Sequence, residues 1–153
     1  MIEPSAQVGV FGHGYTYSGH PVGCAVALKV LEIFERDNVF AQAAKTGEYM
    51  QSKLTTLGEH PLVGEVRGKG LIAALELVAD KDKQQGFAGG SVGAYAAKCC
   101  QDNGLIVRAV AGNSIALCPP LITTEAQIDA IISKLETSLN QTLDYVINQG
   151  LKV

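Results

Sequence analysis

The chain has 153 residues, of which 12 are lysine or arginine, 15 are aspartate or glutamate, and 47% are hydrophobic. This length suits one domain with a sizeable core, and the hydrophobic share is too high for an intrinsically disordered chain. The formal charge of −3 also argues against the basic surface of a nucleic-acid-binding protein.

Nothing in the residue pattern points to a membrane or to secretion. Lys29 and Glu32 interrupt the best apolar stretch, whereas a membrane helix needs roughly 20 apolar residues. The first residues, MIEPSAQVGVF, lack the basic region and apolar stretch of a signal peptide. We therefore expect a cytoplasmic protein that binds neither membranes nor nucleic acids.

Two helices are predicted in the first part of the chain. Proline is tolerated in the first turn of a helix, so Pro21 can begin one that ends near Arg36. Asn38 is then expected to cap a second helix. The apolar residues at helical spacing in the second helix are Val39, Ala43, Met50, Leu54 and Leu57. Together the two helices would form a helical hairpin.

The next segment alternates as a strand does. The sequence PLVGEVRGKGLIAALELV, residues 61–78, predicts two short strands or one strand with a glycine kink. A polar loop, residues 79–91, follows. Ser91 is expected to cap a helix that runs to about Asn103, and the Asn-Gly pair at 103–104 to stop it.

The last part of the chain predicts a hairpin and a long helix. LIVRAV (105–110) and SIALCPP (114–120) are short apolar strands joined by the turn residues AGN, and the two prolines close the edge of the sheet. Thr124 and Gln127 fit a capping box, and the apolar stripe after them marks an amphipathic helix. This order of elements predicts an α+β fold in which helices cover one face of a small, mostly antiparallel sheet.

The four cysteines give no sign of a metal centre. They lie inside apolar segments, and their spacing is not that of a zinc site. They are Cys24, Cys99, Cys100 and Cys118. We expect buried free thiols and no metal.

The stretch FGHGYTYSGHPVGCAVALKVLEIF, residues 11–34, places glycines and hydroxyls at the start of a helix. Glycines let a backbone approach a ligand closely, and helix N-termini favour anions, so this environment suits a phosphate. Such clusters are more often plain caps and turns. His13 and His20 are likewise more often loop residues than catalysts, and the residues alone leave both interpretations open.

The order of the residues in this stretch is more informative than its composition. GYTYSGHPVGCAVAL closely resembles the segment that opens the C-terminal part of class III, pyridoxal-phosphate-dependent aminotransferases of fold type I, above all the ω-amino acid:pyruvate subgroup. VRGKGLIAALELV, NGLIVRAV and IALCPPLIT continue the resemblance in order over nearly the whole chain.

The resemblance implies the organisation of the chain. Residues 1–20 would be a remnant of the large cofactor-binding domain that carries its phosphate-contacting loop. Residues 21–58 would form the long connecting helix and a second helix. Residues 59–153 would form the small α+β C-terminal domain of fold type I aminotransferases.

The resemblance also implies roles for single residues. Thr16 matches a threonine that contacts the phosphate of pyridoxal phosphate in the neighbouring subunit. Tyr15 matches an aromatic residue that lines the partner's substrate pocket, although a packed loop aromatic is an equal alternative. Arg108 matches a mobile arginine that binds the substrate carboxylate and swings aside for substrates without one.

The residue pattern predicts different roles for three basic side chains. A guanidinium among the apolar residues of a strand is costly to bury without a carboxylate, which agrees with a ligand-binding Arg108, although a solvent-facing strand-end arginine is the alternative. Arg67 matches a family position, but it is expected to fix a turn rather than to catalyse. Lys69, in an exposed turn, would be a poor nucleophile.

One departure from the family matters most. An aminotransferase needs a lysine that forms a Schiff base with the cofactor and an aspartate that holds its pyridine nitrogen, and both lie upstream of the threonine motif in this family. No lysine of this chain stands in that context. The expected function is therefore the C-terminal part of a transaminase that acts on an amine or ω-amino acid and pyruvate or another keto acid.

Two functions remain open from the sequence. The chain would be inactive alone, would need the missing large domain as a partner, and would form a homo-oligomer. The alternative is a free-standing, non-catalytic module that uses the same fold to dimerise or to bind a small anion.

Overall fold

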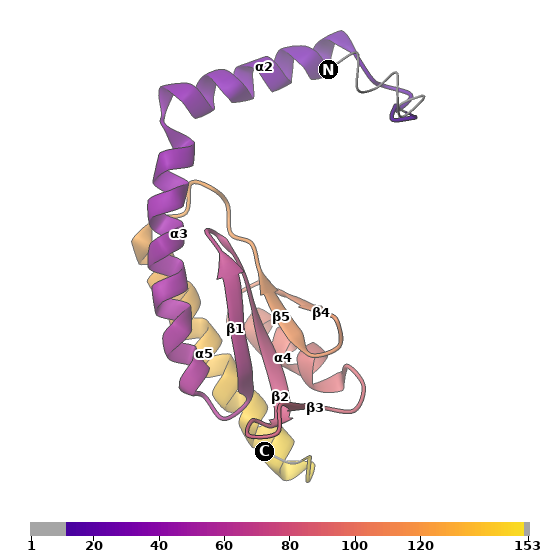
Figure 1. Cartoon of the computed structure of the whole chain (residues 1–153), viewed down its shortest axis with the longest axis vertical. Coiled ribbons are helices and arrows are strands. Elements are labelled where there is room, and N and C mark those ends of the chain that lie inside the picture. Colours follow the sequence, from indigo (N-terminus) through magenta and orange to yellow (C-terminus); the bar gives the residue numbers. More distant parts are fainter. Residues whose placement is uncertain (1–11, 152–153) are drawn as a thin grey trace. The chain divides into compact units, whose positions relative to one another are not determined.

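A computed structural model describes residues 12–151 (Figure 1). These residues divide into two compact units, with the boundary between Asp37 and Asn38. The first unit contains a loop and helix α2 (Pro21–Arg36). The elements of the second unit, in chain order, are α3 (Val39–Thr56), the 3-10 turn η1 (Leu57–Glu59), β1 (Val63–Lys69), β2 (Ile72–Asp80), β3 (Gln85–Gly86), α4 (Ser91–Asp102), β4 (Arg108–Val110), β5 (Ser114–Leu117) and α5 (Glu125–Asn148).

Helix α2 has the predicted bounds, with Pro21 in its first turn and Arg36 in its last. None of its residues is buried. The large apolar residues that its helical spacing aligns are exposed: Val22, Val26, Leu28 and Leu31. Its sequence pattern is therefore that of a core-facing helix, while residues 12–37, the described part of the first unit, contain no buried residue for it to pack against. The predicted hairpin would join the two units and stays a prediction.

Helix α3 buries the face that the sequence predicted. Val39, Ala43, Met50 and Leu54 are all buried along it. The expected cap is wrong, because Asn38 adopts a left-handed conformation with φ of 49° and makes no side-chain cap hydrogen bond. An N-cap residue normally has an extended backbone that aims its side chain at the first turn.

The sheet is antiparallel throughout, in the order β1-β2-β5-β4, with β3 paired only to β2. The glycine-rich stretch thus forms two strands, and Gly70, with φ of 57°, lies in the turn between them. At Gly47 of α3, an added Cβ would lie 2.6 Å from the Cα of Gly70. A glycine at position 47 therefore lets α3 pack directly on this turn.

The strand predicted over residues 105–110 begins only at Arg108. The backbone N–H of Leu105 donates to the carbonyl of Cys100 at 2.8 Å, and that of Gly104 donates to Gln101 at 2.9 Å. Gly104 has φ of 75°. These bonds form a Schellman cap on α4, so they take residues 103–105 out of the sheet ladder.

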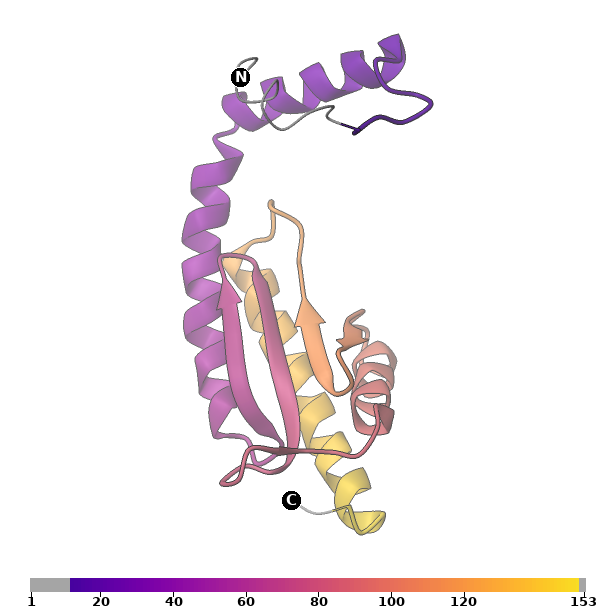
Figure 2. The ribbon, with the colours of Figure 1, turned by 45° about the vertical axis from the view of Figure 1, so that its right-hand side comes forward.

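The two faces of the sheet differ in burial. Leu75, Leu77 and Ile115 point to one face and are almost completely buried. Ala74 and Ala116, which alternate with them, are only partly buried on the other face. In Figure 1, helices α4 and α5 lie behind the sheet and α3 runs along β1, and Figure 2 shows α5 behind the strands and α4 at their right-hand edge. The α+β prediction, with one helix-covered face, is confirmed.

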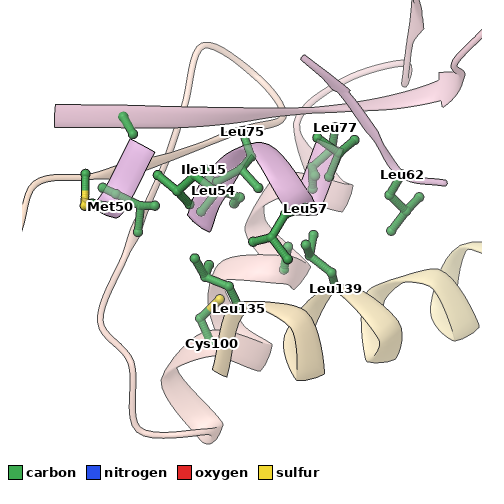
Figure 3. Packing of buried hydrophobic residues seen from close by; sticks show 14 of the residues in the cluster. Met50, Leu54, Leu57, Leu62, Leu75, Leu77, Cys100, Ile115, Leu135 and Leu139 are labelled. Carbon is green, nitrogen blue, oxygen red and sulfur yellow. The ribbon is translucent and has the colours of Figure 1, made fainter. Parts of the chain in front are cut away.

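The core lies between this face and the helices (Figure 3). Leu54 and Leu57 lie between Leu75 of β2 and Leu139 of α5. A hydrogen bond and an ion pair join α3 to α5: the Tyr49 hydroxyl donates to Asp129 Oδ1 at 2.8 Å, and Lys53 Nζ lies 3.2 Å from the same oxygen. The first and last helices of the second unit are thus held against each other.

The last two helices start differently. Ser91 was the expected cap of α4, but it is the first helical residue, and Gly90 precedes it without a side-chain cap bond. The capping box of α5 is confirmed: Thr124 Oγ1 accepts from the N–H of Gln127 at 3.3 Å, and Gln127 Oε1 accepts from the N–H of Thr124 at 2.9 Å.

The described residues contain no helix long and apolar enough to cross a membrane. Among them there is also no cluster of three or more side chains suited to hold a metal ion. All four cysteines are free; Cys99 and Cys100 are buried as expected, but Cys24 and Cys118 are exposed. Both exceptions lie near large apolar residues that are themselves exposed in the described part of the chain, which is why an apolar context misled the prediction.

Candidate functional site

The glycine and hydroxyl stretch of the first unit folds as a tight turn. The backbone N–H of Ser18 donates to the carbonyl of Tyr15 at 2.9 Å, and the N–H of Tyr15 donates to Ser18 Oγ at the same distance. Gly19, with φ of 76°, redirects the chain into α2. Thr16 lies in this turn and is exposed. Its hydroxyl makes no hydrogen bond to another described residue.

The N-terminus of α2 follows directly. His20 occupies the cap position, and its side chain makes no cap hydrogen bond. The first N–H groups of a helix lack intrahelical partners and carry partial positive charge. An uncapped helix start, close in sequence to a free threonine hydroxyl, fits the needs of a phosphate.

The aromatic residues of this loop pack loosely. Tyr15 is 73% exposed and its ring meets that of His13 edge-on, with centroids 5.1 Å apart. Tyr17 is 79% exposed and lies 5.9 Å from His20 by the same measure. Tyr15 therefore presents most of its ring to whatever approaches the loop.

Arg108 lies in the second unit, at the first position of β4. It pairs in register with Ala116 of β5, and both point to the face of the sheet that the helices do not cover. The residue is exposed. Its guanidinium forms no hydrogen bond or ion pair with another described residue. An unpaired guanidinium on an open face is able to bind a carboxylate in a bidentate manner.

Arg67 contrasts with Arg108 on the same face. Its Nη1 donates to Glu65 Oε2 at 2.7 Å and to Glu76 Oε2 at 2.6 Å. Its Nη2 donates to Ser114 Oγ at 3.4 Å. The hydrogen bond to Glu76 is the main cause that raises the pKa of Arg67, with Glu65 adding to it and burial opposing it. These bonds tie β1 to β2 and β5.

Sequence reasoning missed the two carboxylates around Arg67. Glu65 and Arg67 are two residues apart on β1, so the sequence shows only that their side chains share a face of the sheet. Glu76 joins them because residue 65 pairs with residue 76 across the β1–β2 ladder. That register follows from the turn at Gly70, and the hydrophobic pattern of each strand gives a secondary signal for it.

The structure describes the expected site in two parts. Thr16 and Tyr15 belong to the first unit, whereas Arg108 and Arg67 belong to the second. Each part presents unpaired polar groups at its own surface.

A hollow in the second unit is lined by one charged side chain, and that side chain is already hydrogen-bonded. It measures about 380 Å³ and lies between residues 104–105, residues 119–123 and helix α5. Its charged side chain, Lys134, donates to the carbonyls of Asn103 and Gly104 at 3.0 Å each. Lys134 therefore stabilises the end of α4.

The comparisons with known proteins agree with one another. The family model described as aminotransferase class-III matches residues 2–139. The putrescine–pyruvate aminotransferase of Pseudomonas aeruginosa is 42% identical over 148 residues, which covers 96% of this chain and 32% of that protein. A probable mitochondrial γ-aminobutyrate transaminase of Oryza sativa subsp. japonica is 40% identical over 143 residues, which covers 93% and 28%.

A solved structure gives the same result. The ω-transaminase of Pseudomonas jessenii in complex with PMP is 42% identical, with a TM-score of 0.83, over 95% of this chain and 32% of that one. The chain spans about a third of the length of the curated relatives it matches. The α+β fold is therefore shared with part of each of these proteins.

Proposed function

The chain belongs to the class-III aminotransferase family, and we propose that it is the part of a pyridoxal-phosphate-dependent transaminase that moves an amino group between an amine or ω-amino acid and pyruvate or another keto acid. The observation that carries this proposal is the family match over residues 2–139, a range that includes both the loop of Thr16 and the strand of Arg108.

The residues of the first unit fit the phosphate of the cofactor. Bound pyridoxal phosphate supplies an electron sink that stabilises negative charge on the substrate carbon. The Thr16 hydroxyl would donate to a phosphate oxygen, and the free N–H groups at the start of α2 would add to this contact. We propose that Thr16 serves the active site of a neighbouring subunit, so that the protein works as a homo-oligomer.

The residues of the second unit fit an acid substrate. Arg108 would hold the carboxylate of the amino or keto acid through two parallel N–H donors, and it would turn aside for an amine without a carboxylate. Tyr15, with its exposed ring, would line the substrate pocket beside Thr16. These contacts bind and orient the substrate.

The remaining machinery would come from protein outside this chain. None of its nine lysines, at positions 29, 45, 53, 69, 81, 83, 98, 134 and 152, stands in the context of the family's catalytic lysine. We propose that residues 1–20 complete a large cofactor-binding domain, that residues 21–58 connect it, and that residues 59–153 form the small domain. Alone, in the cytoplasm or in a test tube, this chain would be inactive.

A reconstitution assay tests the proposal. The purified chain is mixed with pyridoxal phosphate, putrescine and pyruvate, with and without the N-terminal two-thirds of the P. aeruginosa relative, and alanine is measured. We expect alanine only from the mixture. Thr16→Val should weaken cofactor binding in the mixture, whereas Thr55→Val, which removes a hydroxyl bonded to Gln51 on α3, should leave it unchanged.

Two results would contradict the proposal in different ways. Borohydride reduction that fixes the cofactor onto a lysine of the chain alone, together with turnover, would show an independent enzyme. Failure to bind the cofactor or to form alanine in either condition would favour a non-catalytic module that dimerises or binds a small anion.

A further inference from the structure

We propose that the hollow between the end of α4, residues 119–123 and helix α5 is a binding site for a small amphipathic acid, which is a molecule with one carboxylate and an apolar body. Thr16, Tyr15 and Arg108 do not line this hollow. The inference therefore goes beyond the proposed function and does not rest on it.

The hollow has the size and the walls of a small-molecule site. It measures about 380 Å³, and pockets for small ligands measure roughly 300–1,000 Å³ and are mostly apolar. A smaller hollow of about 230 Å³ shares four of its lining residues. The apolar residues that line the larger hollow are Leu105, Pro119, Pro120, Ile122, Ala130 and Ile131. Ile122 is 75% exposed, so a ligand would remove apolar surface from water.

Thr123 provides a buried polar group without a partner. It lines the hollow and is only 8% exposed. Its backbone N–H donates to the carbonyl of Pro120 at 3.0 Å, but its hydroxyl makes no hydrogen bond to any of residues 12–151. A hydroxyl that is withdrawn from most of the water and left unpaired costs free energy. An acceptor atom of a ligand in the hollow would remove that cost.

The nitrogen atoms that line the hollow still have N–H groups to donate. Lys134 Nζ has three N–H donors and uses two of them on the carbonyls of Asn103 and Gly104. Gln127 uses its side-chain oxygen in the capping box, and its amide nitrogen has no partner in the described part of the chain. No carboxylate of residues 12–151 lines the hollow. A carboxylate fits these groups, because it only accepts hydrogen bonds and its charge is opposite to that of Lys134.

The helical spacing of α5 sets the length of the ligand. Gln127, Ile131 and Lys134 follow one another at i, i+4 and i+7, so they share one face of the helix. Seven residues correspond to about 10 Å along the helix axis. The ammonium group thus lies at one end of an apolar floor, and Gln127 lies toward the other end. A carboxylate bound to Lys134 would place a chain of several carbons over Ala130 and Ile131.

A neighbouring hollow of about 410 Å³ beside α3 is less suited to an acid. Thr123 lines both hollows. The lysine of the neighbouring hollow, Lys45, already lies 3.6 Å from Glu125, which lines the same hollow. An acid bound there would be repelled by Glu125. Lys134, in contrast, has no ion-pair partner among residues 12–151, so the acid is assigned to its hollow.

Octanoate tests the proposal with the full 153-residue chain. Binding is measured by calorimetry and located by NMR shifts of the backbone N–H groups. Octanoate should bind saturably with a Kd of roughly 1 mM or below, and the melting temperature should rise with its concentration. Octylammonium has the same apolar body with the opposite charge and should bind at least about tenfold more weakly. Propionate lacks the apolar body and should not reach saturation. Equal binding of octanoate and octylammonium would overturn the proposal.

Two lysine variants test the choice of hollow. Lys134→Gln should weaken octanoate binding by about tenfold or more, because it removes a charge-assisted hydrogen bond. Lys45→Gln removes the same charge from the neighbouring hollow and should leave binding unchanged. Equal losses in the two variants would overturn the assignment to the hollow of Lys134.

Three further variants keep the test valid if Lys134→Gln disturbs the end of α4. Thr123→Val keeps the shape of the side chain and should weaken binding by about two- to tenfold. Ala130→Phe fills the hollow, keeps every donor and should abolish binding. Ser133→Phe places the same ring at an exposed position of α5 that lines neither hollow, so binding should be unchanged. Full binding in both Thr123→Val and Ala130→Phe would overturn the proposal.

The reconstituted mixture shows whether the hollow stays open beside a large domain. In a mixture with the N-terminal two-thirds of the P. aeruginosa relative that forms alanine, octanoate should still bind. Loss of binding there would overturn the proposal, because it would show that protein covers the hollow. Alanine formation is measured separately, so failure of the octanoate site and failure of the proposed function are distinguishable.

Discussion

The two units of the chain differ in how they are stabilised. Helix α2 of the first unit has no buried residue, although its apolar residues follow a helical spacing. The second unit buries a continuous core from three helices and the sheet. An isolated helix of this length is marginal in water, since most helical stability in proteins comes from packing. The position of the polar loop in the first unit therefore depends on a surface that covers α2. The polar side chains of the second unit are instead held in place by that unit's own core.

The largest expected effect is a difference in the free energy of unfolding between two leucine-to-alanine substitutions, one in each unit. Leu75→Ala removes a side chain that is 1% exposed in the core, and it should lower the free energy of unfolding by about 2–5 kcal/mol. Leu28→Ala on α2 removes one that is 68% exposed and should change it by less than about 0.5 kcal/mol. Urea unfolding measures both. Equal losses would show that α2 is covered in solution.

A pair of glycine substitutions should have opposite signs. Gly47→Ala forces a methyl group to within 2.6 Å of the Gly70 backbone, and overpacking of this kind costs about 1–3 kcal/mol. Gly23→Ala on α2 meets nothing within 4 Å and should favour the helix by about 0.5–1 kcal/mol. Thermal unfolding reports the first change, and helix content by circular dichroism reports the second. Destabilisation by both would mean that α2 is packed closely.

The helix caps provide a smaller contrast. Thr124→Ala removes one half of the capping box of α5 and should cost about 1 kcal/mol. His20→Ala replaces a cap residue of α2 whose side chain makes no cap bond, so it should cost almost nothing. Denaturant midpoints at constant m-value measure both effects. A comparable loss at His20 would show an interaction supplied from outside this chain.

The smallest expected effect depends on pH. His60 Nδ1 accepts from the N–H of Leu62 at 3.2 Å, and Nε2 is buried without a hydrogen bond of normal geometry. Burial is the main cause that lowers the pKa of His60 from its ordinary 6.5, and Lys81 lowers it further, while Asn140 and Glu136 oppose the shift without cancelling it. The unfolded chain thus takes up the proton first, so stability should be full above about pH 6.5 and fall as the pH drops below it.

Replacement of this histidine checks the effect. His60→Gln should flatten the change in stability between pH 7 and pH 5.5, whereas His20→Gln, in the first unit, should leave the slope as it is. A slope that persists in His60→Gln would assign it to other groups.

Much of the fold was predictable, because local signals and burial agreed. The proline start of α2, the buried face of α3 and the capping box of α5 are confirmed. Asn38 and Ser91 misled the prediction of caps, because composition does not show which residue near a helix start has the extended backbone that capping requires. Strand β4 is shorter than predicted, since Leu105 bonds to the end of α4 instead.

The candidate site was predictable only in part. Thr16, Tyr15 and Arg108 were named through the family resemblance, and their roles stay proposals. The hydrogen bonds from Arg67 to Glu76 and Ser114 depend on the pairing of three strands. Periodicity within one strand contains no information about such pairing, so these two partners emerged only from the register.

The contact between α3 and α5 also orders events during synthesis on the ribosome. Tyr49 and Lys53 bind Asp129, about 80 residues later in the chain. At about 5–20 residues per second, strands β1 and β2 emerge several seconds before the helix that completes the cover of the sheet. Its apolar face is available to chaperones in that interval, and a nascent chain stalled before α5 would be a substrate for quality control.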